Sequence, residues 1–501
     1  MMGEIKTKKI LLSLGVLVVG GAIVLIIVLN FQKQPSKLSF QAVLSDINKV
    51  HAAQTLEKGE DLAYIKHDIP DDLGFTQDEL DQLEIPASYQ ESGILTKEEA
   101  KNDLDLFSRS LYYCYAGYGI FGKAAFDKAY AQAMQQIEET GSPMRAIALE
   151  GILDKNYQFI QDGHFYISRY CPLVVNNTLF LKDRVFVKEE NAYYQQNKKH
   201  NKIISINNTP PENWMKLSID SDGNLVYRIS DLSIRLSENV SISYEDGTVE
   251  KVVLKKLNST TYNSQKLFSN EKVNNVPIVS IRSFEDQKAD ESFLNTAEEI
   301  KNSPVAVIDL RGNKGGWPYY VQEWLQKYNA ALVTYTDGKS SIWLATRSGC
   351  YLMAQDAKKR QGILPEIKKE YIDDNMYIYK YGQNSWKISK QQFKRVPNKH
   401  LLFVLTDSSV ASAGESLIAA LRNQDNVIFV GTNTNGCLIG ATPRPITLSH
   451  SKIPVYFCGV MKNYFNKDVF QEGRGFSPDI WVDGDALQYT LNLISQMHIV
   501  Q

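Results

Sequence analysis

A serine where an apolar strand turns into a helix is the most chemically suggestive feature of the sequence. Residues 404–421 read VLTDSSVASAGESLIAAL, so a strand ends in a serine-rich turn and a helix follows at once. The first N–H groups of a helix lack partners and the helix dipole favours negative charge there. Ser412 would therefore lie beside a cradle for an oxyanion, as an acyl-transfer nucleophile requires. Ser412 and Glu415 also have the spacing of a helix capping box, and the stretch taken alone favours a cap over a catalyst.

A glycine-rich turn follows another apolar strand about a hundred residues earlier. Residues 309–316 read DLRGNKGG, after the strand VAVIDL at 305–310. Glycines allow backbone N–H groups to point at a ligand. The string lacks the GK[ST] ending of a phosphate loop and the GxGxxG of a dinucleotide fold, so it indicates neither. Without a ligand it is a tight strand-to-helix turn.

The two strings occur in a fixed order with two others. DGH at 162–164 precedes them, and EGRGFSPD at 472–479 follows them. Together the strings resemble the S41 peptidases, the group of the C-terminal processing peptidases and the tricorn core protease. The resemblance covers roughly residues 96–501. It implies that Ser412 is the nucleophile, and that the N–H of Ala413 pairs with an amide of Gly315 or Gly316 to hold the oxyanion.

The general base departs from one branch of this family. Processing peptidases use a lysine twenty-five residues after the serine, and Cys437 stands at that position here. The tricorn-like branch instead uses an early histidine and a late glutamate, which match His164 and Glu472. A histidine can take the serine proton at neutral pH while a carboxylate fixes its tautomer. Asp479 is the second candidate for this acid.

Each of these residues also has an ordinary structural interpretation. His164 follows Asp-Gly and would then be an exposed turn residue, and Glu472 beside a glycine would be part of a surface loop. Cys437 is a minor alternative nucleophile. The tricorn-like branch carries a serine before its histidine, where this chain has Gly163.

The surrounding pattern predicts an α/β (α+β) protein that positions these residues. Helical periodicity after the capping box Thr96–Glu99 predicts a small bundle over 96–160. Short alternating strands predict a β-rich region over 161–262, either a degenerate PDZ-like module or a family-specific insert. Alternating strands and helices over 263–501 predict the S41-type (ClpP/crotonase-like) catalytic core.

A basic insertion interrupts this core at 351–399, where eleven Lys and Arg face five acids. Such a run is a lid that steers substrate, a contact with an anionic surface or a solvated surface insertion.

The N-terminus indicates where the protein works. Residues 10–29 carry no charge and are long enough to cross a bilayer, after Lys6, Lys8 and Lys9. We expect a cytoplasmic tail over 1–9, an uncleaved transmembrane anchor over 10–30, with a cleavable signal peptide as the alternative, and over 31–95 a spacer of unknown structure, either alone or with a small packed element. The rest would then be extracytoplasmic, although Lys33 and Lys37 on the far side weaken this orientation.

Composition excludes several other classes of protein. The chain has 501 residues, 43% of them hydrophobic, and a net charge of −2, with no motif for nucleic acid. Its five cysteines show no CxxC pair, which argues against a disulfide scaffold or a zinc site. The resemblance needs no metal and no cofactor, and the oligomeric state cannot be read from the sequence.

The sequence therefore predicts a membrane-anchored, extracytoplasmic serine endopeptidase acting on peptide or protein substrates through Ser412, His164 and Glu472. The alternative is a catalytically inactive S41-like protein that binds peptides or serves as a scaffold.

Overall fold

The computed structural model describes most of the chain after the N-terminal segment. The described ranges are 38–54, 67–196, 201–256, 266–334, 339–362, 367–390, 395–441, 443–464 and 469–497. Within them, no helix has both the length and the apolar character that a membrane span requires. The predicted tail and the predicted anchor over 10–30 lie outside the described residues.

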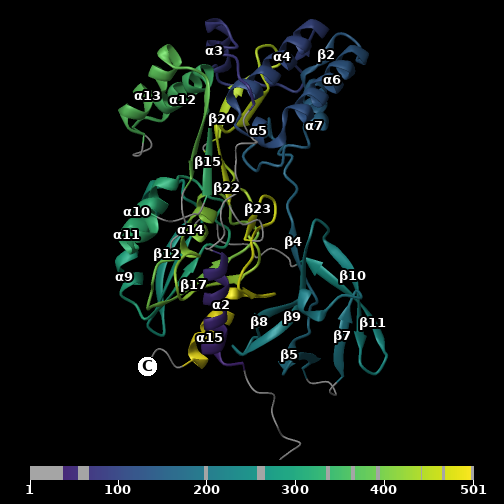
Figure 1. The fold of residues 1–501 in the computed structure, drawn as a ribbon, viewed down its shortest axis with the longest axis vertical. Coiled ribbons are helices and arrows are strands. Elements are labelled where there is room, and N and C mark those ends of the chain that lie inside the picture. The colour runs from purple at the N-terminus through teal and green to yellow at the C-terminus, as the bar shows by residue number, and fades with distance from the viewer. Residues whose placement is uncertain are drawn as a thin grey trace, which may run out of the picture.

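A six-stranded sheet forms the centre of the catalytic core (Figure 1). Its order is β12-β13-β14-β17-β18-β25, and all pairs except β12–β13 are parallel. Strands β13, β14, β17 and β18 are buried along their whole length, which explains their continuous apolar sequences. The bounds are β12 Phe268–Val273, β13 Val276–Ile281, β14 Val305–Asp309, β17 Leu401–Thr406, β18 Val427–Gly431 and β25 Ile480–Trp481.

Helices cover both faces of this sheet. One hydrophobic cluster joins the sheet to α8 (Gln287–Leu294), α9 (Ala297–Lys301), α10 (Pro318–Tyr328) and α14 (Ala413–Leu421), and α11 (Ala330–Thr334) adjoins α10 and α14. A second cluster joins the other face to α2 (Phe40–Gln54) and α15 (Ala486–Gln496). The α/β architecture predicted for 263–501 is therefore present.

Part of the predicted spacer over 31–95 is folded onto this core. Val43 and Ile47 of α2 are buried in the cluster that contains Phe403 of β17. Further along, α3 (Gln77–Leu83) buries Leu80 and Leu83 in the core of the helical bundle. The sequence did not predict these contacts because they join segments far apart in the chain, for which there is no local signal.

The helical bundle over 96–160 forms the upper end of the molecule in Figure 1. The predicted capping box is formed, since Thr96 accepts the N–H of Glu99 and Glu99 accepts that of Thr96. The elements are β1 Ile94–Leu95, α4 Lys97–Cys114, α5 Gly117–Phe121, α6 Lys123–Glu139, β2 Met144–Arg145 and α7 Ala146–Asn156.

The β-rich region forms a separate lobe at the lower right of Figure 1. Its eight strands follow the order β4-β11-β10-β7-β6-β5-β9-β8 around a core of their own. The described residues of 161–262 form one short 3-10 helix, η2 (Pro211–Asn213), and no α-helix. The lobe is therefore an all-β module. Its strands are β4 Asn177–Phe180, β5 Phe186–Glu189, β6 Ala192–Gln195, β7 Lys202–Ile206, β8 Met215–Ile219, β9 Leu225–Ser233, β10 Ser237–Tyr244 and β11 Val249–Lys256.

The basic insertion connects the core to the helical bundle. Helices α12 (Arg347–Arg360) and α13 (Lys369–Tyr381) lie beside the bundle, and Tyr351 and Leu352 are buried in its cluster. A sheet of order β16-β15-β22-β19 runs between the catalytic core and the helical bundle. Its strands are β15 Lys339–Ala345, β16 Ser385–Lys390, β19 Gly440–Ala441 and β22 Val460–Tyr464. Two smaller sheets contain β3 Tyr166–Ile167, β20 Arg444–Thr447 and β21 Pro454–Phe457, and β23 Phe470–Gln471 and β24 Gly475–Phe476.

Candidate active site

Ser412 lies in a sharp turn between strand β17 and helix α14. Its φ of 51° is in the left-handed region, which costs a residue with a side chain free energy. The surroundings hold it there, because the Ser412 N–H donates to the Cys437 carbonyl at 2.9 Å and to Glu415 Oε2 at 3.3 Å. A strained serine before a helix is the arrangement of nucleophile turns in other hydrolases.

His164 reaches this serine from a loop 248 positions earlier in the chain. Its Nε2 lies 3.1 Å from Ser412 Oγ, within hydrogen-bond distance. Burial, with a smaller contribution from the charge of Lys462, lowers the pKa of His164 to about 4. The imidazole is therefore neutral at pH 7, which is the state that can accept the serine proton.

Two acids, the buried Asp162 and the half-buried Glu472, hold the loop that carries His164. Asp162 accepts the His164 N–H at 2.9 Å and the Tyr115 hydroxyl at 2.9 Å. Glu472 accepts the Gly163 N–H at 2.9 Å. Burial raises the pKa of Asp162 to about 6 and that of Glu472 well above its usual range.

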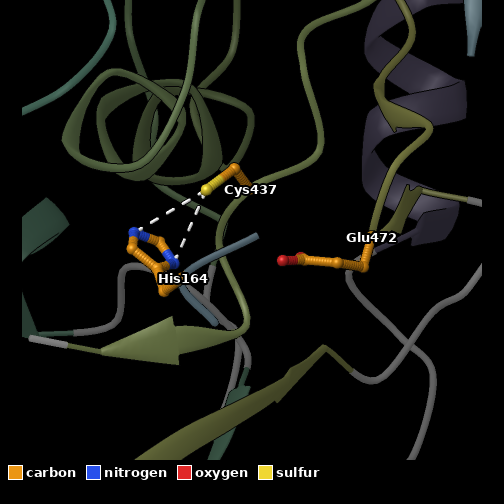
Figure 2. Close-up of side chains that lie close together, drawn as sticks. All are labelled: His164, Cys437 and Glu472. Atoms are coloured by element: carbon orange, nitrogen blue, oxygen red, sulfur yellow. Dashed lines mark hydrogen bonds between the residues drawn. The ribbon is translucent and has the colours of Figure 1, made fainter. Parts of the chain in front are cut away.

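Glu472 acts on the backbone rather than on the imidazole ring. Besides Gly163, it accepts the N–H groups of Leu438 and Ile439, both at 3.1 Å. Among the described residues, no hydrogen bond joins it to the ring of His164. In Figure 2, Glu472 lies to the right of His164 and Cys437, and its carboxylate points toward these two side chains. The tautomer-fixing role predicted for Glu472 is thus not realised by a direct bond in this structure.

Cys437 occupies the space beside the imidazole. Its Sγ lies 3.6 Å from Nδ1 and 3.7 Å from Nε2 of His164. A Cβ added to Gly163 would lie 2.6 Å from this sulfur, so the thiol fills the volume that a serine at position 163 would need. Burial raises the pKa of the Cys437 thiol well above its usual value, which disfavours the thiolate and with it the alternative nucleophile.

Glu415 is a site residue whose structural role the sequence only partly revealed. It is fully buried and accepts the Thr434 hydroxyl and the N–H groups of Gly436 and Cys437, each of the latter at 2.8 Å. Burial raises its pKa to about 7. The capping-box spacing pointed to Glu415 as a cap, and nothing in the sequence indicated that it also holds the 434–437 loop.

The candidate oxyanion donors are only partly available. Ala413 and Gly316 both line the cavity at Ser412, and among the residues that the structure describes their N–H groups have no hydrogen-bond partner. Gly315 differs, because its N–H donates to Asn313 Oδ1 at 2.8 Å. Gly315 instead provides close approach, since a Cβ there would lie 2.7 Å from Ser412 Cβ.

The second candidate acid, Asp479, belongs to another part of the molecule. It accepts from His51 Nε2 of α2 at 2.8 Å and from the Phe429 N–H at 2.8 Å. Asp479 therefore helps to fasten α2 to the core sheet and is not the partner of His164. No local pattern indicates this pairing, because His51 lies 428 positions earlier in the chain.

A cavity of about 1180 Å³ opens over Ser412 and His164. The basic insertion contributes to its wall through Met353, Arg360 and Tyr371. The insertion is therefore not a freely solvated segment. The charged residues that line the cavity are the basic Lys314, Arg360, Arg444 and Lys462 and the acidic Glu285 and Asp356.

Comparison with known proteins gives one family match and several solved structures of low sequence identity. Residues 275–482 match the model of peptidase family S41. No curated protein matches the chain. Among solved structures, mature CPAF complexed with lactacystin is 12% identical, covering 80% of this chain and 99% of that one, with a TM-score of 0.42. The photosystem II D1 C-terminal processing protease is 11% identical, covering 78% and 94%, with a TM-score of 0.35. The tricorn protease is 11% identical, covering 80% and 37%, with a TM-score of 0.35.

A strained serine at a helix N-terminus within this matched segment defines the class of the protein, which is a serine-type peptidase. Its residues 275–482 belong to peptidase family S41.

Proposed function

We propose that the protein is a membrane-anchored, extracytoplasmic endopeptidase that cleaves peptide bonds through an acyl-enzyme on Ser412. The observation that carries the catalytic part is the 3.1 Å contact between Ser412 Oγ and a neutral His164 Nε2. The anchor rests on the uncharged segment within residues 10–30.

In the first step, Ser412 Oγ attacks the scissile carbonyl carbon while His164 Nε2 takes the hydroxyl proton. The carbonyl oxygen becomes an oxyanion, and the Ala413 and Gly316 N–H groups are the candidate donors for it. The imidazolium then gives its proton to the leaving amine. Water next attacks the acyl-enzyme while His164 takes a proton from the water and passes it to Ser412 Oγ, which releases the acyl group. Glu472 and Asp162 contribute by keeping the His164 loop in place.

The test is the pair of variants Ser412→Ala and His450→Ala, the second a histidine of a partly exposed loop. We expect Ser412→Ala to abolish peptide cleavage and labelling by a fluorophosphonate while leaving the unfolding temperature unchanged. His450→Ala should retain both activities. Unchanged turnover in Ser412→Ala would refute the assignment, and a wild type that takes up no label would favour the inactive scaffold.

A further inference from the structure

Three side chains with metal-binding atoms face one another beside Ser412. His164, Cys437 and Glu472 each offer one ligand atom, and these atoms all lie within 4.8 Å of one another (Figure 2). They come from three segments, the loop after α7, the loop before β19 and the turn after β23. Neither the spacing of the cysteines nor the family resemblance predicted this cluster.

The separations suit a small tetrahedral ion. With Zn–S near 2.3 Å and Zn–N near 2.0–2.1 Å, sulfur and nitrogen lie about 3.5 Å apart in a tetrahedral site. Cys437 Sγ and His164 Nδ1 are 3.6 Å apart, and Sγ is 3.7 Å from Nε2, so the imidazole has to turn until Nδ1 points at the ion. The ligand atoms of the three side chains lie within 4.8 Å of one another, which is wider than the spacing of about 3.5 Å in a tetrahedral site. The Glu472 carboxylate therefore has to move toward the other two by about 1 Å to complete the set.

The ligand atoms remain available for an ion. Each carboxylate oxygen has two lone pairs, and within the described ranges Glu472 Oε1 accepts the Gly163 N–H and no second donor, which leaves one lone pair for an ion. Among the described residues, His164 Nδ1 has no hydrogen-bond partner other than Cys437 Sγ. A thiolate and a carboxylate together balance the two charges of Zn²⁺, which suits a buried site.

We propose that Cys437, His164 and Glu472 form an inhibitory site for a thiophilic divalent cation such as Zn²⁺. Binding forms bonds from the ion to Cys437 Sγ, to His164 Nδ1 and to the Glu472 carboxylate. The thiol proton and the proton of the Glu472 carboxyl pass to solvent, and the ring proton moves from Nδ1 to Nε2. An ion on Nδ1 leaves the ring proton on Nε2, where it faces Ser412 Oγ. The ring can then no longer accept the serine proton, so the peptidase is switched off until the metal is removed.

The regulatory part rests on the proposed role of His164 as base, so binding and activity are measured separately. Metal-free protein is titrated with Co²⁺, whose bond to a thiolate gives a charge-transfer band in the near ultraviolet, and with Zn²⁺ by calorimetry. Peptide cleavage is followed in parallel with and without a chelator. Cys171→Ser is the matched control, because Cys171 is a thiol of the same cavity outside the cluster.

We expect one ion per chain, a thiolate band in the wild type and in Cys171→Ser, and loss of cleavage that the chelator reverses. Cys437→Ser should lose the band and bind Zn²⁺ more than about 100-fold more weakly. Losing a residue that only hydrogen-bonds to a ligand costs at most about 100-fold, so a larger loss indicates that Cys437 itself binds the metal. Its inhibition is judged against its own metal-free rate. Ser412→Ala should retain the band, since the serine is not a ligand.

Two results would overturn the proposal, namely no thiolate band in the wild type, or a band and an inhibition that persist in Cys437→Ser. Cys437→Ala replaces the serine variant if the latter does not fold. A wild type that forms the band but cleaves no peptide would refute the proposed function and leave the metal site standing. An active wild type that forms no thiolate band would refute the metal site and leave the proposed function standing.

Discussion

The two halves of the candidate site are built in different ways. The serine half is local, because Ser412, Ala413 and Glu415 belong to one strand, turn and helix of the core. The histidine half is assembled from the 162–164 loop, the 436–439 loop and Glu472, which are separated by up to 309 positions. The geometry of the nucleophile is therefore encoded in a short stretch, whereas that of the base depends on the tertiary fold.

Two glutamates, the buried Glu415 and the half-buried Glu472, join these halves through one loop. Glu415 accepts the N–H groups of residues 436 and 437, and Glu472 accepts those of residues 438 and 439. Four consecutive N–H groups are thus divided between the helix of the serine and the turn that holds the histidine loop. Cys437 lies at the centre of this connection, so the two halves are set relative to each other by the loop that contains it.

The largest effect should come from removing the base. We expect His164→Ala to lower kcat by about 10⁴- to 10⁶-fold, because the serine loses the group that takes its proton. The double variant His164→Ala/Ser412→Ala should be no slower than either single variant, since residues of one catalytic unit act together. Steady-state cleavage of a fluorogenic peptide measures both. A His164→Ala enzyme within tenfold of wild type would assign the base elsewhere.

The difference between the halves also explains what the sequence could predict. The helix that begins at Ser412 and the buried strands β14 and β17 follow from apolar runs and turn residues, which are local signals, whereas these signals alone favoured Ser412 as a helix cap and its role as nucleophile came from the resemblance. His164 and Glu472 were found only through the resemblance, because nothing local links residues so far apart. The hydrogen bonds of Glu472 to the backbone, the packing of α2 and the pairing of Asp479 with His51 are tertiary contacts without a local signal.

On the serine half, Gly315→Ala should have the next largest effect. The new Cβ would lie 2.7 Å from Ser412 Cβ, and the φ of 92° at Gly315 strains any other residue. We expect kcat to fall by about 10²- to 10³-fold, as when an oxyanion donor is lost. Thermal unfolding and kinetics should be measured together.

Gly122→Ala is the control for strain, because Gly122 has a φ of 84° and open space around its Cβ position. It should lower the unfolding temperature and leave kcat unchanged. If Gly315→Ala also changed only stability, the close approach of Gly315 to Ser412 would have no catalytic role.

On the histidine half, Glu472→Gln should have a smaller effect. The amide must turn its NH₂ toward at least one of the three N–H groups that the carboxylate now accepts, and an unpaired buried donor costs about 1–3 kcal/mol. If this loosens the His164 loop, kcat falls by about tenfold for each 1.4 kcal/mol lost from the transition state. KM should change little, since Glu472 does not line the cavity.

Hydrogen exchange of Gly163 separates positioning from simple destabilisation in that variant. Faster exchange at Gly163 with unchanged exchange in α14 would show that only the histidine half has loosened. Equal increases in both would mean that Glu472 stabilises the whole core and does not position the base.

The smallest effect concerns the charge beside the base. His164 must be neutral to accept a proton, so activity is lost as the pH falls through its pKa in the folded protein. Since that pKa is lowered to about 4, the acid limb of kcat/KM should lie near 4, well below the usual 6.5 of histidine. Lys462 disfavours the imidazolium, and Lys462→Met should therefore move the limb to higher pH. Lys314→Met, in the same cavity, should leave the acid limb in place.

A limb that moves to lower pH in Lys462→Met would contradict the assignment of His164 as base. A limb near 6 in all three enzymes would instead indicate Asp162, whose pKa is about 6 and whose protonation would release the His164 N–H.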